Sequence, residues 1–138
     1  LEPEEIQSIY QNNKIKGLVS GTRGEGYGLP LLEAAATGLP VLATNWSGHK
    51  DFLNLGKWIK LDYELQPIHP TRVDNKIFME GSKWAEINEK DFKRKVRKFY
   101  KATEKPEEWA KDLQKKIKEN FSQQAVSKKY SEIFDGIL

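Results

Sequence analysis

The apolar and polar positions in the first half of the chain alternate between helical and strand-like patterns. Apolar residues at helical spacing predict a helix over residues 2–12, another over 30–37 and a short one over 49–55. Three short apolar runs between these helices predict buried strands: 16–21, 40–44 and 57–61. Because the connections are short, successive strands should be parallel and joined by right-handed crossovers. We therefore expect an α/β fold, with a partial parallel sheet of about three strands flanked by helices.

The second half of the chain loses this alternation and then becomes helical. Prolines, a glycine and scattered polar residues over 62–88 predict an ordered but irregular stretch. Beyond it, Asn88 and Ser122 are suited to cap helices, and Pro106 is suited to open a helix between them. These three helices carry apolar stripes that include Phe92, Val96, Phe99, Tyr100, Trp109, Leu113, Ile117, Val126, Tyr130, Ile133 and Phe134.

Length and composition are those of one compact domain or of one part of a larger domain. The chain has 138 residues, of which 38% are hydrophobic and 31% charged, so much of the charge must be solvated. We expect an α/β unit (1–62), an irregular connection (63–88) and C-terminal helices of the same domain (89–138). The absence of Cys excludes a disulfide scaffold, a Cys-based zinc site and a Cys nucleophile. The uncharged apolar stretches are too short to span a bilayer.

Charge is distributed unevenly along the sequence. Residues 1–79 carry eight basic and nine acidic side chains, whereas residues 80–138 carry 15 basic and 11 acidic side chains. The basic surplus of the second half fits either solvated helix faces or a polyanion-binding surface. Acidic residues interleave with the basic ones and no block reaches five like charges, which favours solvated faces. Nucleic acid is therefore not an expected partner, and a non-catalytic polyanion-binding module stays as an alternative.

The segment that carries recognisable chemistry is Ser20–Gly38, which leads from a predicted strand into a predicted helix. Ligands of open α/β sheets bind at the carboxyl ends of the strands, where a helix N-terminus offers N–H groups and a positive dipole end to phosphate. Gly24, Gly26 and Gly28 would let the main chain approach such a ligand closely. The spacing of these glycines fits neither the Walker pattern nor the dinucleotide fingerprint.

Two carboxylates accompany this turn. Glu25 lies in the glycine-rich loop, and Glu33 follows eight positions later, about one turn into the helix. A carboxylate can accept hydrogen bonds from two sugar hydroxyls, so the pair suits a ligand with hydroxyls on both sides of a diphosphate, such as a nucleotide sugar. Alternatively, Glu25 is an exposed loop acid and Glu33 is a favourable acid near the start of the helix. Spacing alone does not decide between these interpretations.

A resemblance to a known family favours the nucleotide sugar. The chain closely resembles the second lobe of the retaining group 1 glycosyltransferases, also called family 4, over residues 24–44 (GEGYGLPLLEAAATGLPVLAT). The signature of these enzymes is two Glu separated by seven residues, then a small-residue helix, Gly, Pro-Val and a strand. The specific likeness covers residues 16–54 and includes the loop and helix of the NWSGHKDFL segment. It implies that the sheet is Rossmann-like and forms half of the C-terminal lobe of a two-lobed GT-B fold.

The resemblance also implies a role for each residue of the segment. Glu25 would be the catalytic-site acid that accepts hydrogen bonds from the transferred sugar, without being a covalent nucleophile, and Glu33 would hold the ribose hydroxyls. Sugar and diphosphate would be bound through four main-chain N–H groups, those of Gly26, Tyr27, Gly28 and Leu29. The implied reaction is of the hexosyltransferase type. A sugar moves from a nucleotide diphosphate sugar to an acceptor hydroxyl with retention of configuration, and neither a metal nor a cofactor takes part.

Other side chains near the segment are weaker candidates. Arg23 and Lys50 could substitute for the basic residues that the family uses at the diphosphate, although plain surface charge is the favoured interpretation. Trp46 could be a platform for a sugar ring or could simply pack against its neighbours. His49 could lie near the site, but a capping or packed histidine is favoured.

Finally, the resemblance implies missing parts and partners. In the family, a first lobe carries the acceptor contacts and earlier strand–helix units carry diphosphate contacts, and neither precedes Leu1. The chain is thus expected to be a fragment that is inactive alone and needs the N-terminal lobe of the same protein. It should self-associate through stranded apolar residues, namely Tyr130, Ile133 and Phe134. The protein is expected to be cytoplasmic, and the parent could in addition be peripheral to a membrane. Rival hypotheses are a GT-B relative with phosphorylase or epimerase chemistry and a structural domain with a dead donor site.

Overall fold

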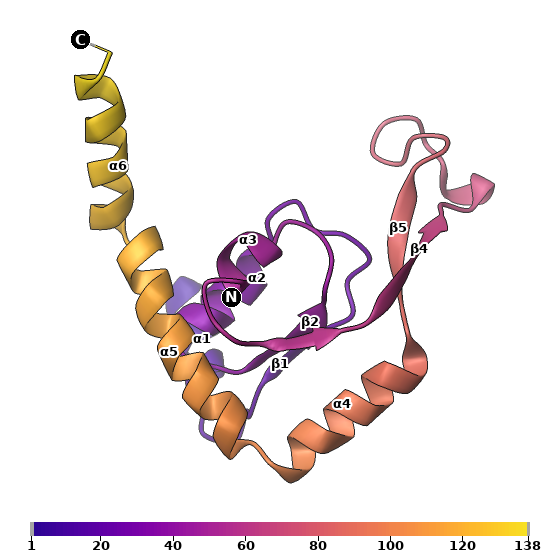
Figure 1. Cartoon of the computed structure of the whole chain (residues 1–138), viewed down its shortest axis with the longest axis horizontal. Coiled ribbons are helices and arrows are strands. Elements are labelled where there is room, and N and C mark those ends of the chain that lie inside the picture. Colours follow the sequence, from indigo (N-terminus) through magenta and orange to yellow (C-terminus); the bar gives the residue numbers. More distant parts are fainter. Residues whose placement is uncertain (1, 138) are drawn as a thin grey trace.

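The structure is a computed structural model that describes residues 2–137. Leu1, the first residue of the expected α/β unit, and Leu138, the last residue of the expected C-terminal helices, lie outside the described residues. Its elements are α1 (Pro3–Tyr10), β1 (Leu18–Ser20), α2 (Leu29–Ala36), β2 (Val41–Thr44), α3 (Lys50–Leu53), β3 (Ile59–Leu61), β4 (Tyr63–Pro67), the 3₁₀ helix η1 (Pro70–Arg72), β5 (Lys83–Ile87), α4 (Glu89–Lys101), α5 (Glu104–Phe121) and α6 (Gln123–Asp135). Figure 1 shows a central body from which α6 and the β4–β5 ribbon project as two arms.

A three-stranded parallel sheet forms the centre of the body, in the order β1–β2–β3. Leu18 of β1 pairs with Val41 of β2, and Leu42 of β2 pairs with Ile59 of β3. All four residues of β2 are buried, as expected for the central strand of a parallel sheet that is covered on both faces. The expected α/β class, with three parallel strands and a helical C-terminal tail, is therefore confirmed.

The main core lies between the sheet and the helices α2, α3 and α5. Its buried residues form one cluster: Leu31, Ala34, Ala35, Leu39, Val41, Ala43, Phe52, Leu53, Trp58, Leu113 and Ile117. Ala34 and Ala35 are fully buried, and these small side chains let α5 pack closely on α2. The helix α4 lies on the other side of the sheet, where the ring of Phe99 fills the space beside Gly17.

The C-terminal helices begin close to where the sequence predicts them. The side chain of Asn88 accepts a hydrogen bond from the first turn of α4, and that of Ser122 does so in α6. The helix α5 begins at Glu104, two residues before Pro106, because proline is tolerated anywhere in the first turn, where no intrahelical N–H bond is lost. Tyr100 was expected on the apolar stripe of α4, but it is 87% exposed, so that placement is wrong.

The stretch 63–88 is not irregular, as the sequence suggested, but is built around an antiparallel ribbon. Strands β4 and β5 pair from Tyr63 opposite Ile87 to Pro67 opposite Lys83. The sequence gives only a weak signal for these strands, because the apolar–polar alternation of β4 covers only Tyr63–Gln66 and β5 does not alternate regularly. Pro67 also argues against a strand unless it lies at an edge, and both strands of a two-stranded ribbon are edges.

The tip of the ribbon is a tight loop organised by Asp74. Its Oδ1 accepts three hydrogen bonds of 2.9 Å, from the N–H groups of Lys76, Ile77 and Phe78. These backbone hydrogen bonds lower the pKa of Asp74. The loop presents Ile77 and Met79 to solvent, although both side chains are apolar.

The second arm, α6, continues from α5 beyond the body (Figure 1) and contains no buried residue. Tyr130, Ile133 and Phe134 are each more than half exposed, and the rings of Tyr130 and Phe134 stack on each other. The stranded apolar surface expected from the sequence is therefore present, while self-association through it stays a prediction. No helix among residues 2–137 has both the length and the apolar character needed to cross a membrane.

Candidate functional site

Two loops meet at the carboxyl edge of the parallel sheet. Residues 21–28 leave the end of β1 and lead into α2, and residues 45–49 leave the end of the neighbouring strand β2 and lead into α3. Parallel strands end at the same edge, so the pairing of β1 with β2 brings these loops side by side. This edge is where open α/β sheets bind their ligands.

The two loops are locked together through the main chain of Glu25. Its N–H donates to Ser47 Oγ (2.7 Å), and its carbonyl accepts from the Ser47 hydroxyl (2.5 Å) and from the N–H of Gly48 (3.1 Å). Ser47 adopts a left-handed φ of +89°, a conformation that the three hydrogen bonds help to hold. A Cβ at position 48 would lie 2.0 Å from the carbonyl oxygen of Gly26, so only glycine fits there.

The start of α2 presents free main-chain N–H groups. Gly28 caps the helix with φ +87° and ψ +54°, a left-handed conformation that turns the chain from the loop into the helix. Four successive N–H groups take part in no hydrogen bond among the described residues: those of Gly26, Tyr27, Gly28 and Leu29. Free N–H groups at the positive end of a helix dipole form a binding site for an anion such as phosphate.

The two candidate carboxylates flank these N–H groups in the sequence, and both are free. Glu25 is half-buried in the loop, and Glu33 is exposed on the second turn of α2. Neither carboxylate is in an ion pair or a side-chain hydrogen bond with any of the described residues. Burial, followed by the nearby charge of Glu33, raises the pKa of Tyr10 on α1, so Glu33 lies toward the α1 side of the helix.

Tyr27 contributes to the site through its packing. Its ring packs at a tilt on Phe52 of α3, with the ring centroids 5.4 Å apart, and joins the edge of the core cluster. Burial and the charge of Asp51 raise the pKa of the phenol. The ring thus anchors the glycine-rich loop to α3, while the neighbouring Leu29 is 60% exposed at the start of α2.

His49 is packed beneath the loops and is fully buried. Its Nε2 donates to the carbonyl of Thr44 at 2.7 Å, and its ring meets the Trp58 ring edge-on. A Cβ on Gly28 would lie 3.0 Å from the Cβ of His49, so the histidine supports the turn that starts α2. Its Nδ1 has no hydrogen-bond partner among the described residues. His49 is thus a packed histidine, which is the interpretation that the sequence favoured.

Arg23 connects the glycine-rich loop to the ribbon. Its carbonyl accepts a hydrogen bond from the N–H of Ala85 (3.0 Å). Its guanidinium forms an ion pair with Glu86 (2.7 Å) and lies over the ring of Trp84, 4.5 Å from the centroid. The β4–β5 ribbon therefore stands beside the loop and fixes the direction of this cation.

Trp46 and Lys50, in the second loop and at the start of α3, are placed differently. The Trp46 ring is half-buried against Tyr63 at the base of the ribbon, with centroids 5.6 Å apart. Lys50 is half-buried and forms no ion pair with any of the described residues. Packing therefore occupies Trp46, whereas Lys50 keeps a free ammonium group near the loops.

Sequence reasoning missed four residues that build this site. Ser47 and Gly48 form the lock between the loops, and no local pattern predicts it because it joins residues about 22 positions apart. Trp84 and Glu86 hold the guanidinium of Arg23. No local pattern near Arg23 predicts these contacts, because both residues lie far along the chain on a ribbon that was not predicted. The described residues contain no group of three or more His, Cys, Asp or Glu side chains suited to hold a metal ion.

Comparison with known proteins gave one match. Residues 1–63 match the model of the family described as "Glycosyl transferases group 1". No curated protein and no solved structure matched the chain. The matched region contains the parallel sheet and both loops of the site, and it supports a glycosyltransferase function in the broad sense.

Proposed function

We propose that the chain is the donor-binding part of a retaining group 1 glycosyltransferase with a GT-B fold. Its ligand would be a nucleotide diphosphate sugar, bound at the edge formed by loops 21–28 and 45–49. The observation that carries this proposal is the set of four free N–H groups at the start of α2, between two unpaired carboxylates. The match of residues 1–63 to the group 1 family supports it independently.

Each part of the site would bind a different part of the donor. The free N–H groups would hold the diphosphate, because they offer donors that no protein group uses. Glu25 would accept hydrogen bonds from the hydroxyls of the transferred sugar, and Glu33 would accept them from the ribose. The catalytic contribution of Glu25 is thus to hold and orient the sugar, with no covalent intermediate on its carboxylate.

Arg23 would supply the positive charge that a diphosphate needs. Trp84 and Glu86 restrict its guanidinium, and a guanidinium has five N–H donors, so pairing with Glu86 leaves others for phosphate. The exposed ion pair with Glu86 contributes little energy itself, so it orients the cation without blocking it. Lys50 is the second cation that could take this role.

The proposed chemistry is displacement of the nucleotide diphosphate by an acceptor hydroxyl. The bond between the anomeric carbon and the phosphate oxygen breaks, and the acceptor oxygen bonds to the same face of that carbon. The acceptor proton passes to the leaving phosphate, so no protein base is needed. Negative charge grows on that phosphate in the transition state, and fixed N–H groups at a helix start stabilise it without reorganising.

Acceptor contacts would come from the N-terminal lobe of the same protein, with the acceptor a glycan or another hydroxyl compound. The test for this chain is therefore donor binding, measured by calorimetry with nucleoside diphosphates and a panel of their sugar conjugates. Glu33→Ala should weaken nucleotide and nucleotide sugar alike, by about 10- to 100-fold for lost hydrogen bonds to a charged group. Glu25→Gln should weaken mainly the nucleotide sugars.

The matched control is Glu108→Ala, which removes an exposed acid from α5 and should leave all affinities unchanged. Arg23→Gln should weaken nucleoside diphosphates more than nucleoside monophosphates. Failure of every member of the panel to bind would contradict the donor site, and so would equal losses for Glu25→Gln and Glu108→Ala. With the parent enzyme, product analysis separates transfer from phosphate-dependent release and from inversion of the sugar.

A further inference from the structure

The helix α4 concentrates the positive charge of the whole chain. It carries seven basic and two acidic side chains, a net charge of +5, whereas the complete chain has a net charge of +3. The rest of the sequence is therefore slightly acidic. The basic surplus seen along the second half of the sequence is thus confined to one helix.

Six of these cations share one face of α4. They recur at spacings of three and one residues, which places them on adjacent turns of one side of the helix. They line one open surface groove: Lys90, Lys93, Arg94, Arg97, Lys98 and Lys101. With a rise of 1.5 Å per residue, this row, called here the cationic row, is about 16 Å long.

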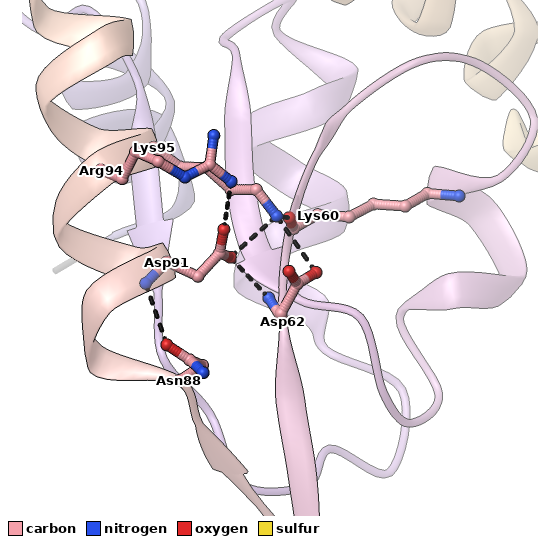
Figure 2. A network of polar contacts seen from close by, with 6 residues as sticks. All are labelled: Lys60, Asp62, Asn88, Asp91, Arg94 and Lys95. Atoms are coloured by element: carbon pink, nitrogen blue, oxygen red, sulfur yellow. Dashed lines mark hydrogen bonds and ion pairs between the residues drawn. The ribbon is translucent and has the colours of Figure 1, made fainter.

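One of the two acids of α4, Asp91, lies on the inner side of the helix and faces Asp62 (Figure 2). Asp91 is buried there and accepts hydrogen bonds from Arg94 (2.5 Å), from Lys95 (2.8 Å) and from the N–H of Asp62 (2.9 Å). Lys95 also donates a hydrogen bond to the carbonyl of Lys60 in β3. Burial raises the pKa of Asp91, but these hydrogen bonds outweigh burial and lower the pKa to about 2.

This network fixes α4 with the cationic row facing outward. Within the row, Lys93 pairs with the exposed Glu89, and Arg94 pairs with the buried Asp91. The other four members of the row have no acidic partner within 4 Å among the described residues: Lys90, Arg97, Lys98 and Lys101. Four uncompensated cations on one fixed face form an anion-binding surface.

The neighbouring helix α5 shows that the row is not a by-product of a lysine-rich chain. It carries five basic and five acidic side chains, so its net charge is zero. Lys116 of α5 pairs with Asp112 on its own surface. The charges of α5 therefore balance, whereas α4 leaves four cations without an acidic partner among the described residues.

We propose that the cationic row docks the protein on an anionic phospholipid bilayer. A row of long cationic side chains along one exposed helix face can reach a planar array of head groups simultaneously. Tyr100 is 87% exposed beside the end of the row, as is typical of an amphipathic ring at a membrane interface. Single-stranded nucleic acid is the less suitable occupant, because its sites combine several aromatic stacking platforms with the cations.

The apolar side of α4 is packed on the body, so the binding would be electrostatic and reversible rather than by insertion. The experiment is flotation of the 138-residue chain with two kinds of vesicle, phosphatidylcholine alone and equimolar phosphatidylcholine and phosphatidylglycerol. We expect binding only to the anionic vesicles, and loss of that binding between about 0.1 M and 0.5 M salt. Replacing the four unpaired cations by Gln should weaken binding by about 100-fold or more.

The matched control replaces four exposed lysines of α5 by Gln: Lys105, Lys111, Lys115 and Lys118. Both quadruple variants have the same net charge, so only the position of the cations differs, and circular dichroism checks that both fold. Equal losses in the two variants, binding to neutral vesicles, or no binding by the wild-type chain would overturn the proposal. Tighter binding to an oligonucleotide than to anionic vesicles of equal phosphate content would overturn it in favour of nucleic acid.

Discussion

The parallel-sheet body and the two projecting arms use their apolar residues in opposite ways. In the body, β2 is wholly buried and one cluster joins α2, α3 and α5. In the arms, the tip of the ribbon and the outer side of α6 expose Ile77, Met79, Ile133 and Phe134. Exposing an apolar side chain to water is unfavourable in the body and in the arms alike. The two regions therefore differ in whether other parts of the chain cover their apolar side chains.

This contrast teaches where the rigidity of the candidate site originates. Both site loops leave buried strands, and Tyr27 and His49 tie them to the core. The ribbon reaches the site through contacts with Gly21, Arg23 and Trp46. Stability should therefore depend on the body, while the ribbon holds one side of the site, and three substitutions sharpen this division.

The largest effect should come from a core aromatic beside the site. Phe52 is fully buried and packs on Tyr27, so Phe52→Ala should cost about 3–5 kcal/mol of unfolding free energy. The matched change in an arm, Phe134→Ala, should stay within about 0.5 kcal/mol because that ring is more than half exposed. Chemical denaturation followed by circular dichroism measures both. Similar costs would show that α6 is part of the body.

A smaller effect is expected where the two loops touch. Gly48→Ala would place a Cβ 2.0 Å from the carbonyl oxygen of Gly26 and should destabilise the fold by about 1–3 kcal/mol, as overpacking does. It should also abolish nucleotide binding, because the loop that carries the free N–H groups must move. Gly24→Ala is the control, since nothing lies within 4 Å of its added Cβ. A Gly48→Ala protein as stable as Gly24→Ala would refute the lock between the loops.

An effect of similar size should depend on pH. Asp91 anchors α4 to the body, and its pKa is lowered from 3.8 to about 2. Because the folded pKa is the lower one, its stabilisation is present above about pH 4 and is lost as the pH falls toward 2, and it amounts to about 2 kcal/mol. Wild type and Asp91→Asn should therefore differ in urea denaturation at pH 6 and converge near pH 2. A constant difference across this range would contradict the assignment.

The sequence predicted those parts of the site that depend on neighbouring residues. The turn of glycines, the helix start at Leu29 and the positions of Glu25 and Glu33 follow from local conformational preferences. The three parallel strands were predictable because buried strands read as short apolar runs between turn residues. Roles for these residues in binding a donor remain predictions.

The parts that escaped prediction depend on contacts between distant segments. The hydrogen bonds of Ser47 with Glu25 join loops 22 positions apart, and no local pattern encodes them. The ribbon was missed because the apolar–polar alternation of β4 covers only Tyr63–Gln66 and ends at a proline, and β5 does not alternate regularly. Its partner Arg23 looked like a plain surface charge for the same reason.

One detail of the lock between the loops has a consequence for how such a protein can diversify. All three hydrogen bonds use the main chain of Glu25, and none uses its carboxylate. The residue identity at position 25 is thus decoupled from the shape of the loop. If the proposed role of Glu25 holds, a lineage could exchange this side chain and acquire a new sugar preference in one mutational step, on an unchanged scaffold.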